Sequence, residues 1–111
     1  MRIVINKPTD YARNFLRKCG YAAFEDPRTK ENSFVRRLTG DFYPRFHAYA
    51  EEDDDKLMID LHLDQKHASY KGSHKHSGEY GGELVEAEAG RLQAEIEYLI
   101  KERRGEEDGE T

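Results

Sequence analysis

The sequence predicts an α+β fold with the element order (β)-α-β-β-β-α. The predicted sheet is mainly antiparallel, has three or four strands, and carries both helices on one face. Three observations predict this fold: a short amphipathic helix pattern near the start, two alternating segments on either side of an acidic run, and a long helical stripe at the end. Residues 1–105 are expected to form one domain, with residues 106–111 as a disordered acidic tail.

A short strand and a helix are predicted first. Residues 2–5 alternate in polarity, and Pro8 fits the first turn of a helix, where its missing N–H costs nothing. Gly20 is expected to end this helix in a left-handed conformation. The positions at i, i+3, i+4 and i+7, which define its apolar face, are Ala12, Phe15, Leu16 and Cys19.

The segment that follows is predicted to be a loop. Residues 21–32 contain Glu25-Asp26-Pro27 and lack a clear period. Residues 33–39 are expected to form a strand that Gly40-Asp41 ends. This strand leads into the clearest unit of the sequence.

Residues 43–50 and 56–64 are predicted to form a β-hairpin around the acidic residues 51–55. In the second strand the odd positions from Leu57 to Leu63 are apolar and the even positions from Met58 to Asp64 are mostly polar. Pairing apolar with apolar residues gathers the polar side chains on the opposite sheet face. The side chains expected on this polar face are Arg45, His47, Tyr49, Asp60, His62 and Asp64.

A glycine-rich connection and a long helix complete the chain. Residues 65–82 are predicted to be a loop, and loops of this length in compact domains are often functional. Residues 83–104 are predicted to be helical, ending at Gly105, because apolar residues recur at 4-3-4-3 spacing. That stripe, which could cover the sheet or pair with another helix, comprises Val85, Ala89, Leu92, Ile96 and Leu99.

Composition excludes several classes of protein. The 111 residues contain no apolar run of the roughly 18–20 residues that a membrane span needs, and no signal peptide is expected. One cysteine, Cys19, excludes an internal disulfide framework and favours a reducing, cytoplasmic location. The net charge of −5 comes from residues 51–55 and 106–111, so basic patches remain elsewhere in the chain.

The first functional hypothesis is a small binding module without catalytic activity. The polar sheet face and the loop after it would together receive an anionic ligand, with nucleic acid or a nucleotide as the first partner. The predicted ligand-binding residues are Arg45, His47, Tyr49, His62, Lys66, Tyr70, Lys71, His74, Lys75 and His76.

The second hypothesis is a metal-dependent hydrolase or nuclease. His62-x-Asp64 and His74-x-His76 each place two metal ligands on one side of an extended segment, and imidazole with carboxylate suits zinc, manganese or iron. The triplet Asp64-Gln65-Lys66 has the acid-x-Lys form found in restriction-endonuclease-like folds, with Asp41 as a second acid for magnesium. The cofactor would be zinc, manganese or magnesium. The catalytic candidates are His62, Asp64, Lys66 and Glu79.

Three motifs carry a resemblance. FYPRFH at 42–47, LHLDQK at 61–66 and HSGEY at 76–80 resemble a family of short bacterial proteins to which no activity is assigned. The resemblance covers about residues 33–92 and implies only that hairpin and loop form one unit. A third functional class, a structural or interaction domain that works through the last helix, stays open. The chain is expected to be a monomer or a weak homodimer through that helix.

Overall fold

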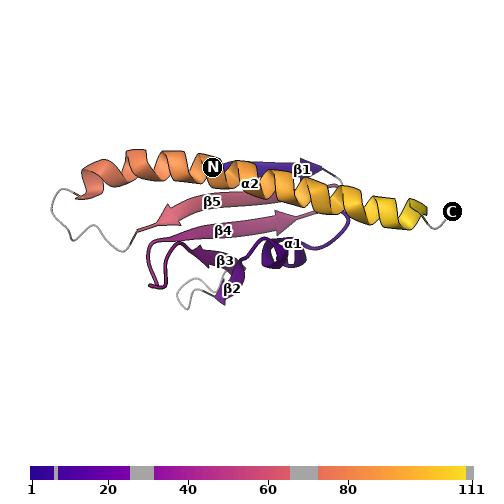
Figure 1. Cartoon of the computed structure of the whole chain (residues 1–111), viewed down its shortest axis with the longest axis horizontal. Helices are drawn as coiled ribbons and strands as arrows, with labels where there is room; N and C mark the ends of the chain where they lie inside the picture. The colour runs from indigo at the N-terminus through magenta and orange to yellow at the C-terminus, as the bar shows by residue number, and fades with distance from the viewer. Residues whose placement is uncertain (7, 26–31, 66–72, 110–111) are drawn as a thin grey trace.

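The computed structural model describes residues 1–6, 8–25, 32–65 and 73–109, and for residues 32, 73–81 and 106–109 it describes the backbone alone. Its α+β fold places five antiparallel strands in one sheet, in the order β1-β5-β4-β3-β2 (Figure 1). The elements are β1 (Arg2–Asn6), α1 (Ala12–Lys18), β2 (Ala22–Glu25), β3 (Asn32–Arg37), β4 (Arg45–Glu52), β5 (Lys56–Asp64) and α2 (Ser73–Gly109).

The strand count differs from the prediction because β2 lies where a loop was expected. Ala22 to Glu25 contains no β-branched residue and has little strand propensity of its own. The segment becomes a strand by pairing antiparallel with β3, where Ala22 lies opposite Val35 and Ala23 opposite Phe34. Tertiary pairing of this kind leaves no periodic signal in four residues.

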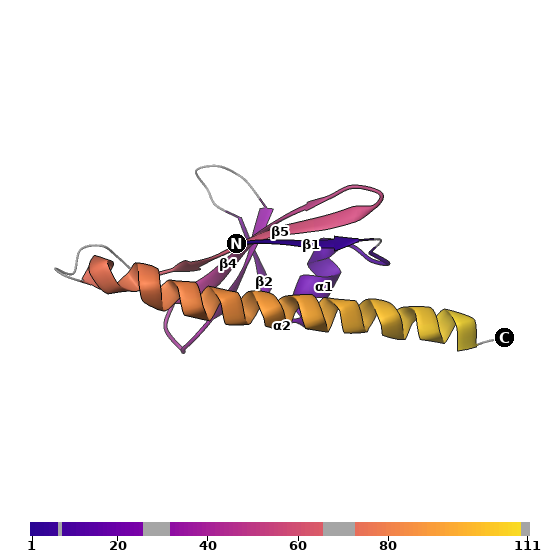
Figure 2. The same ribbon diagram turned by 90° about the horizontal axis from the view of Figure 1, so that it is seen from above.

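The register of the hairpin is the predicted one. Ala48 pairs with Leu61 and Phe46 with Leu63, so the apolar residues of β4 and β5 share one face. Both helices lie on that side of the sheet (Figure 2), as the sequence predicted. The opposite face carries the polar side chains of the hairpin and has no described helix over it.

Helix α1 ends as the sequence predicted. Gly20 has a φ of 98°, a left-handed conformation that glycine adopts without strain. The N–H of Tyr21 donates to the carbonyl of Leu16 at 2.9 Å, which closes the C-terminal turn. The chain is thereby directed from α1 into β2.

Helix α2 is longer than predicted. It begins at Ser73 and not at Glu83, and it continues past Gly105 to Gly109. Glycines favour helix ends because each costs about 1 kcal/mol relative to alanine in a helix. Extending an existing helix needs no new nucleus, however, and the strongly helical segment after Glu83 propagates towards the N-terminus.

The core lies between the helices and the apolar sheet face. From α2 it takes Ala89, Leu92, Ile96 and Ile100, all buried, so the predicted stripe covers the sheet. Glu88, which is 5% exposed, connects α2 to the start of β2 because it accepts a hydrogen bond from the Tyr21 hydroxyl at 2.6 Å. It also accepts a hydrogen bond from Arg91. No helix within the described ranges combines the length and hydropathy that crossing a membrane requires.

Candidate functional site

Six polar residues on β4 and β5 form the candidate site. The register places Arg45 opposite Asp64, His47 opposite His62, and Tyr49 opposite Asp60. Because side chains of directly paired residues project from the same sheet face, all six share the face opposite the helices. The sequence prediction for the polar face is therefore confirmed.

Asp64 is the centre of the site. Its Oδ2 accepts a hydrogen bond from Arg45 Nε at 3.0 Å and lies 2.8 Å from His47 Nδ1, and its Oδ1 lies 2.9 Å from His62 Nε2. Burial alone would raise the pKa of Asp64, but the contacts with His62, Arg45 and His47 outweigh burial and hold this pKa well below its usual range. Asp64 is thus a carboxylate at neutral pH.

The other ring nitrogen of His47 contacts Ser33 on β3. His47 Nε2 lies 2.8 Å from Ser33 Oγ, and that hydroxyl donates to the Phe24 carbonyl of β2 at 2.8 Å. A Ser33 hydroxyl that donates its one hydrogen to Phe24 accepts from His47, which would then carry a proton on Nε2.

In that arrangement two hydrogen-bond acceptors, His47 Nδ1 and Asp64 Oδ2, face each other. A neutral His47 protonated on Nε2 carries a lone pair on Nδ1, which faces the Asp64 carboxylate at 2.8 Å. Burial lowers the pKa of His47, although the hydrogen bond and the charge of Asp64 oppose that shift. A proton on Nδ1, or a cation between Nδ1 and the carboxylate, would remove the opposition of the two acceptors.

Arg45 holds Asp64 from a buried position. The residue is 4% exposed, and its guanidinium carbon lies 4.5–4.8 Å from the ring centroids of Phe42, Tyr43 and Phe24. Among the described residues its Nη1 has no hydrogen-bond partner. The aromatic rings instead stabilise the charge through cation–π contacts. Arg45 was predicted to bind a ligand, but its burial suits it to fixing Asp64.

The outer side of the site is open. The side chain of His62 is 46% exposed and that of Asp64 20%, whereas that of His47 is 6% exposed. The Tyr49 ring stacks on His47 at 4.6 Å and on His62 at 5.6 Å between centroids. A ligand can therefore approach Asp64 and His62 from solvent, over a surface of planar rings.

The predicted loop is helical in its second half. The backbone from Ser73 onward belongs to α2, so the prediction of a loop over residues 65–82 is wrong for residues 73–82, while the shared pocket stays a prediction. His74-x-His76 was expected on an extended segment, and a helical backbone removes that basis. Lys75 and Glu79 lie on the same helical backbone, while Lys66, Tyr70 and Lys71 fall outside the described residues.

The distances between Ser33, His47 and Asp64 resemble those of a Ser-His-Asp triad. A nucleophile must reach its substrate, however, and Ser33 is 1% exposed with its hydroxyl engaged by the Phe24 carbonyl. The geometry therefore does not support acyl transfer. Asp41, the second acid of the nuclease hypothesis, is exposed in the turn after β3 and lies outside the metal-ligand group of His47, His62 and Asp64.

Ser33 and three aromatic residues were missed by sequence reasoning. Ser33 shares the period-two face of β3 with Val35 and Arg37, so its sheet face could have been predicted, although its contact with His47 could not. Phe42 and Tyr43 precede the strand, and Phe24 lies on a strand that the sequence did not predict.

The chain matches no protein-family model, no curated protein and no solved structure. The resemblance carried by the three motifs therefore remains a prediction, and any function has to be argued from the site itself.

Proposed function

We propose that this chain is a metal-binding domain that holds a divalent transition-metal ion, zinc first, through His47, His62 and Asp64. The single observation that carries the proposal is the convergence of these three side chains, whose ligand atoms all lie within 4.8 Å of one another. Two imidazoles and one carboxylate form a ligand set that zinc sites use when a fourth position stays open.

The spacing of these ligand atoms can be compared with the spacing of ligands around a zinc ion. Zinc ligands lie about 2.0–2.1 Å from the metal, so tetrahedral neighbours are about 3.3 Å apart. The contacts of Asp64 with His47 and His62, at 2.8 and 2.9 Å, are a few tenths of an ångström shorter. Zinc binding would require these two contacts to widen by that amount and the most distant ligand atoms, up to 4.8 Å apart, to approach the same spacing.

The surroundings of the cluster also suit a metal. Outer hydrogen bonds usually fix the orientation and tautomer of a ligating histidine. Ser33 does so for His47, and Arg45 does so for the carboxylate of Asp64. The exposed His62 leaves the remaining coordination position towards solvent, where water or an anionic ligand would complete the shell.

Metal analysis of the purified chain tests the proposal. We expect one zinc ion per chain, and a loss of affinity in His62→Ala and Asp64→Asn that exceeds the roughly 10- to 100-fold effect of outer-shell changes. Asp60→Asn is the matched control, because Asp60 lies on the same strand and face but pairs with Arg2 at 2.9 Å. Circular dichroism would confirm that each variant is folded.

Two results would contradict the proposal. One is a chain that binds no zinc in a competition with a chromophoric chelator. The other is zinc that survives in Asp64→Asn and His62→Ala but is lost in His74→Ala/His76→Ala, which would move the site to α2. The latter pair of substitutions otherwise serves as a second control.

A second candidate is binding of nucleic acid or a nucleotide, favoured by the ring surface on the open sheet face. The Tyr49 and His62 rings are 22° from parallel, and bases stack on exposed rings of this kind. A labelled single-stranded oligonucleotide should then bind more weakly as salt rises, and Tyr49→Ala should cost about 1–3 kcal/mol. Absence of binding at low salt would remove this candidate and leave the metal proposal intact.

A further inference from the structure

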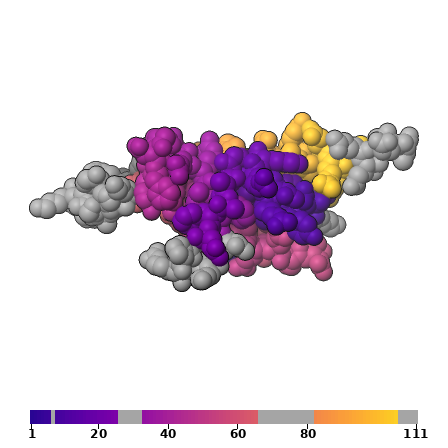
Figure 3. Space-filling view, turned by 90° about the horizontal axis from the view of Figure 1, so that it is seen from below, coloured from indigo at the N-terminus to yellow at the C-terminus, as the bar shows by residue number. Residues whose placement is uncertain are grey.

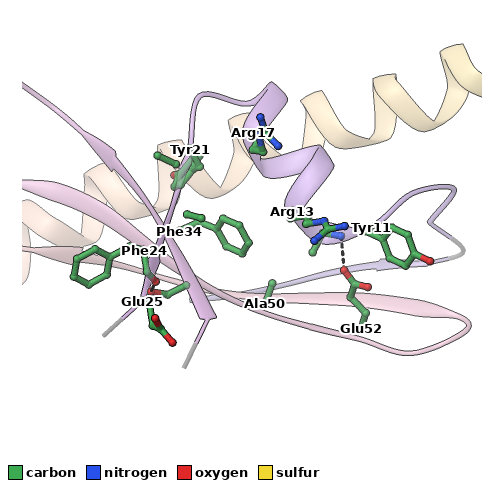
Figure 4. A pocket seen from close by; sticks show the side chains of 13 residues that line it. Tyr11, Arg13, Arg17, Tyr21, Phe24, Glu25, Phe34, Ala50 and Glu52 are labelled. Atoms are coloured by element: carbon green, nitrogen blue, oxygen red, sulfur yellow. Dashed lines mark hydrogen bonds between the residues drawn. The ribbon is translucent and has the colours of Figure 1, made fainter. Parts of the chain in front are cut away.

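A cavity lies between α1 and the strands β2, β3 and β4 (Figure 4). It has a volume of about 1180 Å³, and its lining includes Ser33, which contacts His47 of the candidate site. Tyr21, Phe34 and Ala50 give it an apolar lining, and the α1 side is formed by Arg13 and Arg17. We call this cavity the α1–β2 groove. An apolar lining with a few charged side chains is typical of a binding site.

The α1 wall of the groove is positively charged. Arg13 and Arg17 are one helical turn apart, both are exposed, and neither has a carboxylate partner among the described residues. Glu52, which also lines the groove, accepts a hydrogen bond from the N–H of Ala12 at the start of α1 (Figure 4). The α1 wall therefore offers two guanidinium groups without a carboxylate partner among the described residues, while the acids Glu25 and Glu52 line the strand side of the groove.

The neighbouring wall contains a free sheet edge. β2 is the last strand of the sheet and pairs only with β3, so its outer backbone groups have no strand partner in the described part of the chain. Ala22 and Ala23 are exposed, and β2 contains neither lysine nor proline; its one charged residue is Glu25, at the end of the strand. α1 and β2 lie side by side at the surface in the space-filling view (Figure 3).

We infer that the α1–β2 groove is a docking site for an extended peptide segment of a partner protein, with acidic side chains at alternate positions. The backbone of the segment would pair with β2, as in other cases of strand addition to a sheet edge. Alternate residues of a strand are about 6.6 Å apart on one face, close to the rise of about 6 Å between Arg13 and Arg17. Charge complementarity with these arginines selects acids over bases.

Fluorescence anisotropy with a fluorescein-labelled peptide of four Glu-Val repeats tests the inference. We expect saturable binding, which Arg13→Glu/Arg17→Glu weakens about tenfold through lost attraction and new repulsion. Lys101→Glu/Arg104→Glu is the matched control, because it makes the same charge change on exposed residues of α2 away from the groove. A Lys-Val peptide should not bind, and N-methylation of alternate peptide nitrogens should abolish binding by blocking strand pairing.

Three outcomes of the peptide assay would overturn the inference. They are equal binding of the peptide by the groove variant and its control, binding of the N-methylated peptide, and absence of binding at low salt. Self-association of the chain that Arg13→Glu/Arg17→Glu abolishes would also overturn it, since a second copy, which carries acidic residues 51–55, would then be the occupant. The inference does not rest on the proposed metal site, and His62→Ala should bind the peptide as well as the parent chain does in metal-free buffer.

Discussion

Ser33 shows how one hydroxyl can define the chemistry of a histidine. It is buried, it contacts His47 Nε2, and it donates its single hydrogen to the Phe24 carbonyl. In the proposed site this contact would favour the His47 tautomer that leaves Nδ1 free for a metal, although Ser33 itself would not touch the ion.

Ser33→Ala should weaken zinc binding by roughly 10- to 100-fold while the fold is retained, because His47 loses the partner that orients it. Chelator competition measures the affinity, and nitrogen chemical shifts of the His47 ring report its tautomer. An unchanged affinity together with an unchanged Nε2–H tautomer would show that Ser33 does not position this ligand.

Tyr21 makes a comparable contact on the other side of the sheet. Its hydroxyl donates to Glu88 at 2.6 Å, and burial, reinforced by that carboxylate, raises its pKa far above the ordinary value. Tyr21→Phe should lower the free energy of unfolding by about 1.5–3 kcal/mol, the usual contribution of a hydrogen bond to a charged group. Urea denaturation measures the change, and a loss below about 0.5 kcal/mol would contradict the assigned strength of the contact.

At the scale of elements, the position of α2 on the sheet depends on its buried apolar side chains. Leu92 is fully buried against the sheet, so Leu92→Ala should cost about 2–5 kcal/mol through lost apolar contact and the cavity that remains. Gln93→Ala, at the exposed neighbouring position, should change stability by less than about 0.5 kcal/mol. Similar effects of both substitutions on the urea midpoint would contradict the packing of this helix.

The same helix gives the fold a dependence on pH. Burial alone would raise the pKa of Glu88, but hydrogen bonds from Arg91 and Tyr21 and the charges of Arg91 and Arg36 outweigh it and lower the pKa below 4.5. The unfolded chain then takes up a proton first as the pH falls. The stabilisation by Glu88 is therefore complete above pH 4.5 and is lost as the pH drops through the lowered pKa.

Urea unfolding of the parent chain and Glu88→Gln between pH 6 and pH 3 checks this sign. The parent should be more stable at pH 6, and the difference should shrink in acid. The exposed Glu86→Gln serves as the matched control, with a difference that stays small at every pH. A gap between parent and Glu88→Gln that widens in acid would contradict the lowered pKa.

The hairpin and the apolar stripe of α2 could be predicted because their signals are periodic and local. Leu57 to Leu63 alternates without a break, which fixed both the strand and the face of His62 and Asp64. β2 and the start of α2 could not be predicted, because Ala22-Ala23 has weak propensity and glycines near Ser73 suggest a loop. Two of the three residues in the candidate metal-ligand group, His62 and Asp64, were predicted as metal ligands, whereas His47 was predicted only as a ligand-binding residue.

At the scale of the whole molecule, α2 determines the shape. The principal extents are 61 × 28 × 25 Å, and the radius of gyration of 15.8 Å exceeds the roughly 13 Å of a compact domain of this length. Because the apolar stripe of α2 is already packed on the sheet, we expect an elongated monomer in solution. Light scattering should give 12.9 kDa, and a dimer broken by surface substitutions on α2 would instead support pairing through this helix.

β2 separates the two proposed sites by the thickness of one strand. Phe24 lines the α1–β2 groove, packs edge-on against His47 with 5.9 Å between ring centroids, and offers its carbonyl to Ser33. A partner that immobilised β2 would thus also immobilise the hydrogen-bond chain behind the metal ligand. By thermodynamic reciprocity, an ion that ordered these hydrogen bonds would in turn increase the affinity of the groove for the partner.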